Sequence, residues 1–143
     1  MKLETILDRK SEGVVTIDIS VHLQAAAELM MQKRISALIV TNGREPVGLI
    51  SERDLISAFA DRGPRAADTP IQDVVTEPVL TVSSDESVKR AMALMTKRHV
   101  RHLPIFEDKE LIGIVSLGDL VKYRLEEMEL ESNVLRDLAI AAR

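Results

Sequence analysis

Hydrophobic residues recur every three or four positions in two stretches of the chain. In the first stretch Leu23, Ala26 and Met30 follow this spacing, and the same spacing returns 65 residues later. Residues three or four positions apart lie on one face of an α-helix. Each stretch is therefore predicted to be a helix that buries one side.

Short apolar runs rich in β-branched residues surround each predicted helix. Around the first helix they are residues 14–17, 37–41 and 47–50, and Asn42-Gly43 between the last two is a turn signal. The matching runs around the second helix are residues 79–82, 103–106 and 111–115. A further helix is predicted just after the last run of each set, so the order β-α-β-β-α occurs twice.

These two sets belong to a long internal repeat. With an offset of 65 residues, the segment from Val14 to Phe59 aligns without a gap and has 11 identities in 46 positions. The period is too long, and two copies are too few, for a solenoid. We therefore expect an α+β fold in which two β-α-β-β-α motifs face each other across a pseudo-twofold axis.

The composition between and beyond the two copies predicts the domain boundaries. Gly63, Pro64 and Pro70 mark a linker that holds one short helical turn at "IQDVV". We expect a first motif with an N-terminal helix over residues 1–60 and a linker over residues 61–77. A second motif over residues 78–124 and a helical extension over residues 125–143 follow.

The C-terminal segment is predicted to be one long helix. From Leu117 to Ala142 it contains no proline, and its only glycine is Gly118 in the first turn. Its apolar positions approach a heptad stripe and are Val121, Leu125, Met128, Leu135 and Ala139 or Ala142. Two interpretations stay open: the stripe packs onto its own module, or it joins two copies in a homodimer.

Composition argues against several classes of function. The 143-residue chain is 45% hydrophobic, enough for the core of one compact domain or two small halves, but only 2% aromatic. With so few rings and a net charge of −4, it is a poor candidate for binding nucleic acid. It has no cysteine, no secretory signal and no apolar run as long as a membrane span. We expect a soluble cytoplasmic protein with neither a membrane nor a nucleic-acid partner.

A serine and an aspartate recur at the start of the last helix of each copy. "GLISERDL" contains Ser51 and Asp54, and "GIVSLGDL" contains Ser116 and Asp119. This spacing is that of a helix cap with an acidic residue in the first turn. It also suits a nucleotide, because a helix N-terminus attracts phosphate and a carboxylate accepts hydrogen bonds from the two hydroxyls of a ribose. Both interpretations stay open at this point.

Residues 13–124 as a whole resemble a tandem pair of cystathionine β-synthase (CBS) domains, a Bateman module, as in small bacterial stand-alone CBS-pair proteins. The resemblance rests on "VVTID…GLISERDL", on "PVLTV…HVRHLPIFED…GIVSLGDL" and on "DVVT" in the linker. It implies regulatory binding of an adenosine-containing ligand: AMP, ADP, ATP, S-adenosylmethionine or NAD.

The resemblance also implies two clefts, each built from the motif of one copy and the strand edges of the other. The Asp54 cleft would comprise Ser51, Arg53, Asp54, Val79, Val100, Arg101 and His102. The Asp119 cleft would comprise Ser116, Asp119, Val14, Ile35, Ser36 and Ala37. In the Asp54 cleft Asp54 would hold the ribose, Ser51 and Arg53 would face phosphate, and Val79 and Val100 would flank adenine.

The two clefts differ in their basic side chains. Arg53, Arg101 and His102 belong to the Asp54 cleft, whereas Gly118, Ser36 and Ala37 occupy the equivalent positions of the other. We therefore expect the Asp54 cleft to bind the more phosphorylated or tighter ligand and the Asp119 cleft to be weak or empty. The alternative for this basic stretch is a solvated helix end, where cations suit the helix dipole.

No catalytic residue and no metal site is predicted. A serine that caps a helix is a poor nucleophile, no oxyanion-hole motif is visible, and the spacing of His99 and His102 is not diagnostic of a metal. The sequence thus favours a non-enzymatic nucleotide sensor that forms a homodimer and acts on an unknown effector protein. The alternative is a structural interaction module with no physiological ligand.

Overall fold

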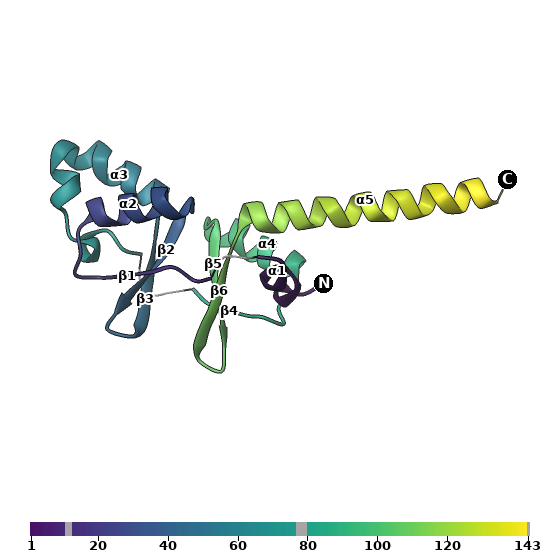
Figure 1. Ribbon diagram of the computed structural model, residues 1–143, viewed down its shortest axis with the longest axis horizontal. Helices are drawn as coiled ribbons and strands as arrows, with labels where there is room; N and C mark the ends of the chain where they lie inside the picture. Colours follow the sequence, from purple (N-terminus) through teal and green to yellow (C-terminus); the bar gives the residue numbers. More distant parts are fainter. Residues whose placement is uncertain (11–12, 77–79, 143) are drawn as a thin grey trace.

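The computed structural model describes residues 1–10, 13–76 and 80–142, and it contains two three-stranded sheets with helices packed beside them (Figure 1). The elements before the second sheet are α1 (Leu3–Arg9), β1 (Thr16–Asp18), α2 (Leu23–Lys33), β2 (Ala37–Asn42), β3 (Glu45–Ser51), α3 (Glu52–Arg62) and two 3₁₀ turns, η1 (Gly63–Asp68) and η2 (Ile71–Asp73). The remaining elements are β4 (Val82–Ser83), α4 (Val88–Arg98), β5 (His102–Glu107), β6 (Glu110–Ser116) and α5 (Leu117–Ala141).

Both sheets have the same topology. The strand orders are β1-β2-β3 and β4-β5-β6, and in each sheet the first pair is parallel and the second antiparallel. The antiparallel ladders shift register at equivalent places, after Val40 in one and after Ile105 in the other. These features confirm the prediction of two β-α-β-β-α motifs.

The first strand of each motif lies further along the chain than predicted, and β4 is also shorter than β1. In the first motif the Ile39 N–H donates to the Val15 carbonyl at 3.2 Å, which prolongs the contact between the chain before β1 and β2. The equivalent residue of β5 is Pro104, which has no N–H to offer to Leu80. The parallel pairing of the second sheet is therefore confined to Val82 and Ser83.

Helices α2 and α4 end in the same way. Arg34 and His99 adopt left-handed backbone conformations with φ of 56° and 55°. The next N–H groups, of Ile35 and Val100, then bond back to the carbonyls of Met30 and Met95 at 3.1 and 3.0 Å. His99 is thus a helix-terminating residue, and this ending fixes where the chain enters β2 and β5.

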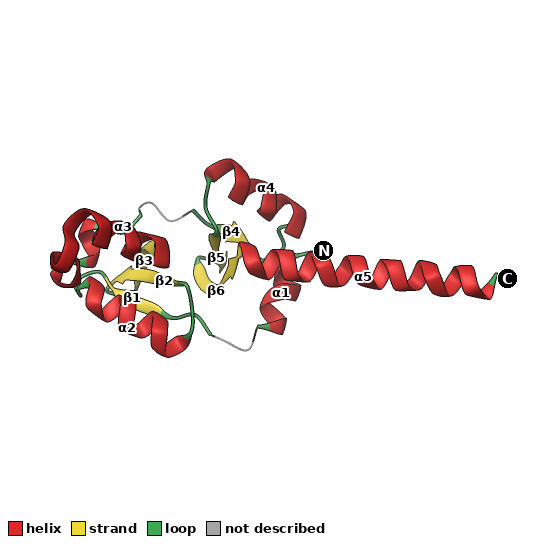
Figure 2. Ribbon diagram, turned by 90° about the horizontal axis from the view of Figure 1, so that it is seen from above, coloured by secondary structure: helices red, strands yellow, loops and turns green. Residues whose placement is uncertain are grey.

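Each motif has its own hydrophobic core, completed by a segment from elsewhere in the chain. Ala66 and Ile71 of the two 3₁₀ turns belong to the core of the first motif. Leu3 and Ile6 of α1 belong to the core of the second motif, although α1 precedes the first motif in the sequence. Figure 2 shows α1 beside α5 and the second sheet. This placement brings the end of α1 close to the start of α5.

Helix α5 leaves the body of the molecule after its first turns. Leu120 and Tyr123 are buried in the core of the second motif, but the rest of α5 projects far beyond it (Figures 1 and 2). The large apolar side chains exposed along this helix are Val121, Leu125, Met128, Leu130, Val134, Leu135, Leu138 and Ile140. The predicted long helix is confirmed. In the part of the chain that is described, no helix has the length and hydrophobicity needed to cross a bilayer.

Candidate functional site: a cavity between the two motifs

The starts of α3 and α5 carry matching capping boxes. The Ser51 N–H donates to Asp54 Oδ2 at 2.8 Å, and the Asp54 N–H donates to Ser51 Oγ at 3.4 Å. The same two hydrogen bonds join Ser116 and Asp119 at 2.8 and 3.0 Å. The helix-cap interpretation of the repeated motif is therefore confirmed, and it leaves the ligand interpretation open.

Strand pairing holds the predicted strand-edge residues next to these helix starts. Ala37 pairs with Ser51, and His102 pairs with Ser116. The first N–H of each helix is also bonded to the preceding strand, since Glu52 donates to the Ser36 carbonyl at 3.0 Å and Leu117 donates to the Arg101 carbonyl at 2.7 Å. Strand pairing and a backbone hydrogen bond within its own sheet thus hold each helix start in place.

A cavity of about 540 Å³ lies between the two motifs. This volume falls in the range of sites for small organic ligands. Its walls include all six residues predicted for the Asp119 cleft: Val14, Ile35, Ser36, Ala37, Ser116 and Asp119. Residues far apart in the sequence, from the first and the second motif, therefore face one space.

Five further residues around the cavity matter for its chemistry. His102 was predicted from the sequence but allotted to the other cleft, whereas Lys10, Arg34, Glu52 and Met30 were not predicted. The cavity combines apolar walls with groups of both charge signs. Such a lining suits a ligand that has both an apolar ring and polar substituents.

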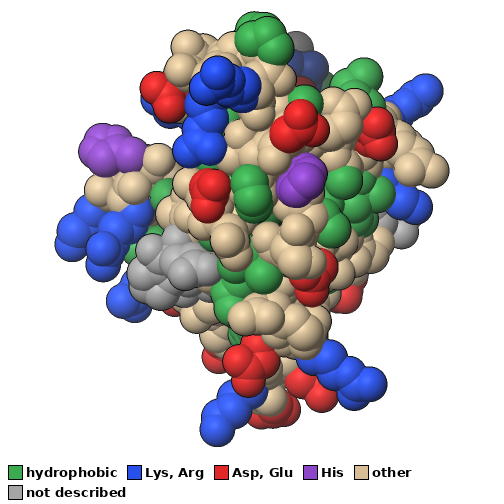
Figure 3. All heavy atoms as spheres, turned by 90° about the vertical axis from the view of Figure 1, so that its left-hand side faces the viewer, with side chains coloured by type: hydrophobic (Ala, Val, Ile, Leu, Met, Phe, Trp, Pro, Cys, Tyr) green, Lys and Arg blue, Asp and Glu red, His purple; other side chains and the backbone are tan. Residues whose placement is uncertain are grey.

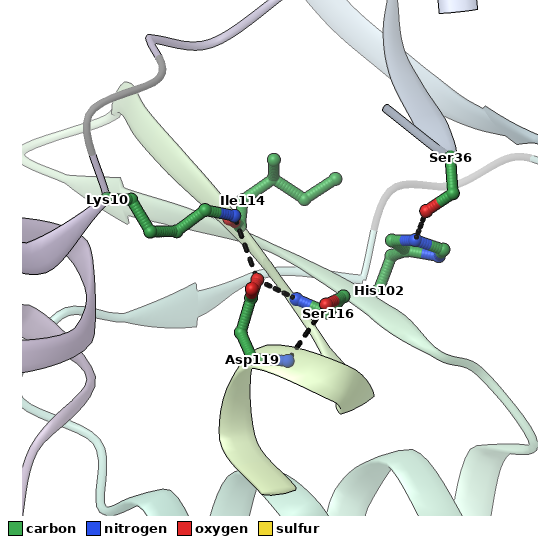
Figure 4. A network of polar contacts seen from close by, with 6 residues as sticks. All are labelled: Lys10, Ser36, His102, Ile114, Ser116 and Asp119. Carbon is green, nitrogen blue, oxygen red and sulfur yellow. Dashed lines mark hydrogen bonds and ion pairs between the residues drawn. The ribbon is translucent and has the colours of Figure 1, made fainter. Parts of the chain in front are cut away.

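Lys10 binds directly to the carboxylate of Asp119 (Figure 4). Its Nζ lies 2.8 Å from Asp119 Oδ2 and 2.9 Å from the Ile114 carbonyl oxygen. Burial by itself raises the pKa of Asp119, but hydrogen bonds from Lys10 and the Ser116 N–H outweigh it, so the pKa lies below its ordinary value of 3.8. The carboxyl group is therefore ionised at neutral pH.

His102 links the two motifs across the cavity. Its Nε2 lies 2.9 Å from Ser36 Oγ, as Figure 4 shows. Burial lowers the pKa of His102 below 6.5, and the positive charges of Lys10 and Arg101 act in the same direction, while Asp119 and Glu52 oppose them. The imidazole is therefore neutral at pH 7 and bridges the halves by a neutral hydrogen bond.

Of the residues predicted for the Asp54 cleft that the structure describes, His102 alone lines this cavity. Arg53 and Arg101 are exposed, Val100 is partly buried, and Ser51 and Asp54 cap α3. Val79 lies outside the described residues. The prediction that the Asp54 cleft binds more tightly than the Asp119 cleft stays a prediction.

The sequence held no direct signal for Lys10. It follows a helix that precedes the first motif, yet that helix packs against the second motif. A local pattern cannot report such a contact. An indirect clue appears only once the fold is known. Lys10 donates to the Ile114 carbonyl, and the equivalent carbonyl of the first motif, that of Leu49, accepts the N–H of Thr76 from outside that motif.

Comparison with known proteins assigns the family. A model of the CBS domain matches residues 8–61 and 71–126, so the chain belongs to the CBS-domain family and carries a tandem pair. It is 30% identical over 118 residues to the CBS domain-containing protein YhcV of Bacillus subtilis, covering 82% of this chain and 84% of that protein.

Two further comparisons agree. The crystal structure of the CBS-domain containing protein ATU1752 from Agrobacterium tumefaciens superimposes with a TM-score of 0.82 at 32% identity, over 86% of this chain and 92% of that one. The mitochondrial CBS domain-containing protein CBSX3 of Arabidopsis thaliana is 36% identical over 107 residues, which are 71% of this chain and 52% of that protein. The match thus spans about half the length of this plant relative.

Proposed function

We propose that this CBS pair is a regulatory module that binds an adenosine-containing nucleotide between its two motifs. The supporting observation is the cavity in which Ser116 and Asp119, at the start of α5, face Ile35, Ser36 and Ala37 of the first motif. A hydroxyl and a helix N-terminus suit phosphate, a carboxylate suits ribose, and the apolar wall suits adenine. The family resemblance points to the same ligand class.

Binding at this position would act on the relative placement of the motifs. A ligand that contacts both walls favours the arrangement in which the walls are correctly spaced. The change would be read by an effector protein or by a second copy of the chain. We propose regulatory binding and no catalytic step.

Calorimetric titration with AMP, ADP, ATP, NAD and S-adenosylmethionine tests this function. We expect at least one of them to bind with a dissociation constant below about 1 mM, which corresponds to roughly 4 kcal/mol. The Asp119→Asn variant should bind that ligand more weakly at the cavity. If none of the five binds below the millimolar range, the nucleotide function is wrong.

A second candidate function is an interaction module without a physiological ligand. The exposed apolar side chains of α5 favour it, because so much exposed apolar surface usually marks a contact with another protein. We propose that α5 joins two copies in a homodimer. This role is compatible with nucleotide binding and would be the only role if the titrations showed no ligand.

A further inference from the structure

Lys10 is hydrogen-bonded to the Asp119 carboxylate, the group that a ribose would need. Its ammonium is 2.8 Å from Asp119 Oδ2, and the same oxygen also accepts the Ser116 N–H at 2.8 Å (Figure 4). A vicinal diol bound by a carboxylate donates one hydrogen bond to each of its oxygens. In the present arrangement Oδ2 already has two donors, so a diol and Lys10 compete for it.

The first motif has a different arrangement at the equivalent place. There the Leu49 carbonyl accepts the backbone N–H of Thr76 at 3.3 Å, while Asp54 Oδ2 accepts hydrogen bonds from the N–H and hydroxyl of Ser51. Lys10 lies before the aligned repeat, and 65 residues further along the chain stands Val75, which carries no charge. The lysine is therefore a specific feature of the Asp119 cavity and does not follow from the repeat.

The ion pair between Lys10 and Asp119 is only partly buried. The side chains of Lys10 and Asp119 are 26% and 28% exposed, so the pair is partly withdrawn from water but open on one side. Helix α1 is firmly attached, because Leu3 and Ile6 are buried in the second core. The flexible side chain of Lys10 can therefore leave Asp119 while α1 stays in place.

We propose that Lys10 is an intramolecular competitor for the ribose-binding carboxylate of Asp119, and that a nucleotide entering the cavity displaces its ammonium. The proposal rests on the nucleotide function proposed above and deepens it by naming the residue that sets the affinity of this cavity. Nucleotide binding and release of Lys10 are then linked. Any interaction that holds Lys10 on Asp119 lowers the affinity for the nucleotide, and a bound nucleotide releases Lys10 from Asp119.

Removal of the Lys10 charge tests the competition. The Lys10→Met variant keeps most of the side-chain volume, and we expect it to bind AMP roughly 2- to 5-fold more tightly than the wild-type chain, as expected for loss of a partly exposed competing ion pair. Lys10→Arg keeps the charge and should bind with nearly wild-type affinity. Lys89→Met, which removes an exposed charge on α4, should leave the affinity unchanged.

A second measurement follows Lys10 itself in the wild-type chain. Acylation of lysine amines by a small reagent, read by mass spectrometry of peptides, should speed up at Lys10 when AMP is added, because the amine leaves its carboxylate. The rate at Lys89 should not change. This measurement needs no substitution and is independent of any effect of Lys10→Met on folding.

The outcomes separate the inference from the function on which it rests. If wild-type protein binds AMP but Lys10→Met binds it equally or more weakly, or if AMP protects Lys10 from acylation, Lys10 is no competitor, and the nucleotide function stands. If neither the wild-type chain nor Lys10→Met binds any of the five nucleotides, both proposals are overturned.

Discussion

Asp54 and Asp119 each cap a helix with one carboxylate oxygen, which leaves the other oxygen outside the capping box. In both residues Oδ2 accepts the serine N–H, so the cap uses one oxygen. The other oxygen has no role in the capping box. The cap holds the carboxylate at the helix start in one orientation, which is the preorganisation that a binding site requires.

The Asp54→Ala variant separates the cap from the ligand at the first of these sites. A hydrogen bond to a charged group contributes about 1.5–3 kcal/mol, so adenylate affinity at the Asp54 cleft should fall roughly 10- to 150-fold. Loss of the capping box should also lower the free energy of unfolding by about 1 kcal/mol. Calorimetry and chemical denaturation measure the two effects.

A matched Asp119→Ala variant provides the comparison between the clefts. Unchanged affinity in Asp54→Ala, together with the loss of stability, would restrict Asp54 to its capping role. If Asp119→Ala has the larger effect on affinity, the sequence-based ranking of the clefts is wrong and the Asp119 cavity is the principal site.

His102 makes the stability of the module depend on pH. Because burial lowers its pKa below 6.5, the folded state binds fewer protons than the unfolded state just below that pH. Its contribution to stability is complete above pH 6.5 and is lost as the pH falls toward the lowered pKa of the folded state. Thermal unfolding at about pH 8 and about pH 5.5 should show a smaller drop for His102→Gln than for the wild-type chain.

The exposed His22 supplies the control for this measurement. It precedes α2 and makes no side-chain capping bond, so His22→Gln removes an imidazole without touching the contact between the two motifs. An identical drop in His102→Gln and wild-type protein would show that the buried imidazole is not responsible.

The repeat predicted the local structure of single residues where both copies carry the same motif. The capping motif of Ser116 and Asp119 is present as predicted, whereas Ser36 was placed opposite it by the family resemblance, and its role in ligand binding stays a prediction. Lys10 could not be assigned, because its position depends on packing between segments more than 100 residues apart. Placing His102 beside Asp119 required the register of β5 on β6, in which His102 pairs with Ser116.

At the scale of elements, regular patterns in the sequence predicted the helices and the hairpins, whereas the lengths of β1 and β4 depend on the strands with which they pair. The helical periods and the turn at Asn42-Gly43 are local signals, and the structure contains α2, α4 and both hairpins where these signals lie. The extent of β1 and β4 depends on which N–H groups the neighbouring strand offers. Pro104 withdraws one of them, and this consequence is visible only once the register of β5 is known.

Helix α1 packs against the second motif through a contact that needs a glycine. A Cβ atom added to Gly113 of β6 would lie 2.5 Å from Leu7 Cδ2, so a larger residue forces Leu7 to move. The Gly113→Ala substitution should lower the free energy of unfolding by about 1 kcal/mol through overpacking. Denaturant unfolding measures this change.

A double-mutant cycle checks that Leu7 is the cause. In the Leu7→Ala background the added methyl group has room, so Gly113→Ala should cost much less there than in the wild-type chain. Additive effects of the two substitutions would mean that the strand, rather than the contact with α1, requires the glycine.

At the scale of the whole molecule, the two ends differ in what they expose. The end formed by α2 and α3 carries apolar side chains interspersed with charged ones, as the face in Figure 3 shows. Ile56 and Phe59 of α3 are exposed, and so is Met31, which lies at the cavity between the motifs. Helix α5 instead presents a series of exposed apolar side chains on a segment that projects beyond the second motif, and an exposed ion pair joins its Glu126 to Arg9. A lone helix with so much exposed apolar surface calls for a partner.

A second copy of the chain is the partner that we predict for α5, and truncation tests it. Deletion of residues 127–143 leaves the buried Leu120 and Tyr123 in place, so the module should still fold, but the mass in solution should fall from that of a dimer to that of a monomer. The double substitution Leu135→Glu with Leu138→Glu should have the same effect, because it places like charges in the apolar contact. Glu129→Gln with Arg136→Gln, which alters only polar positions, should remain dimeric. Light scattering measures the masses, and a truncated chain with the same oligomeric state as the full chain would assign the dimer contact to another surface.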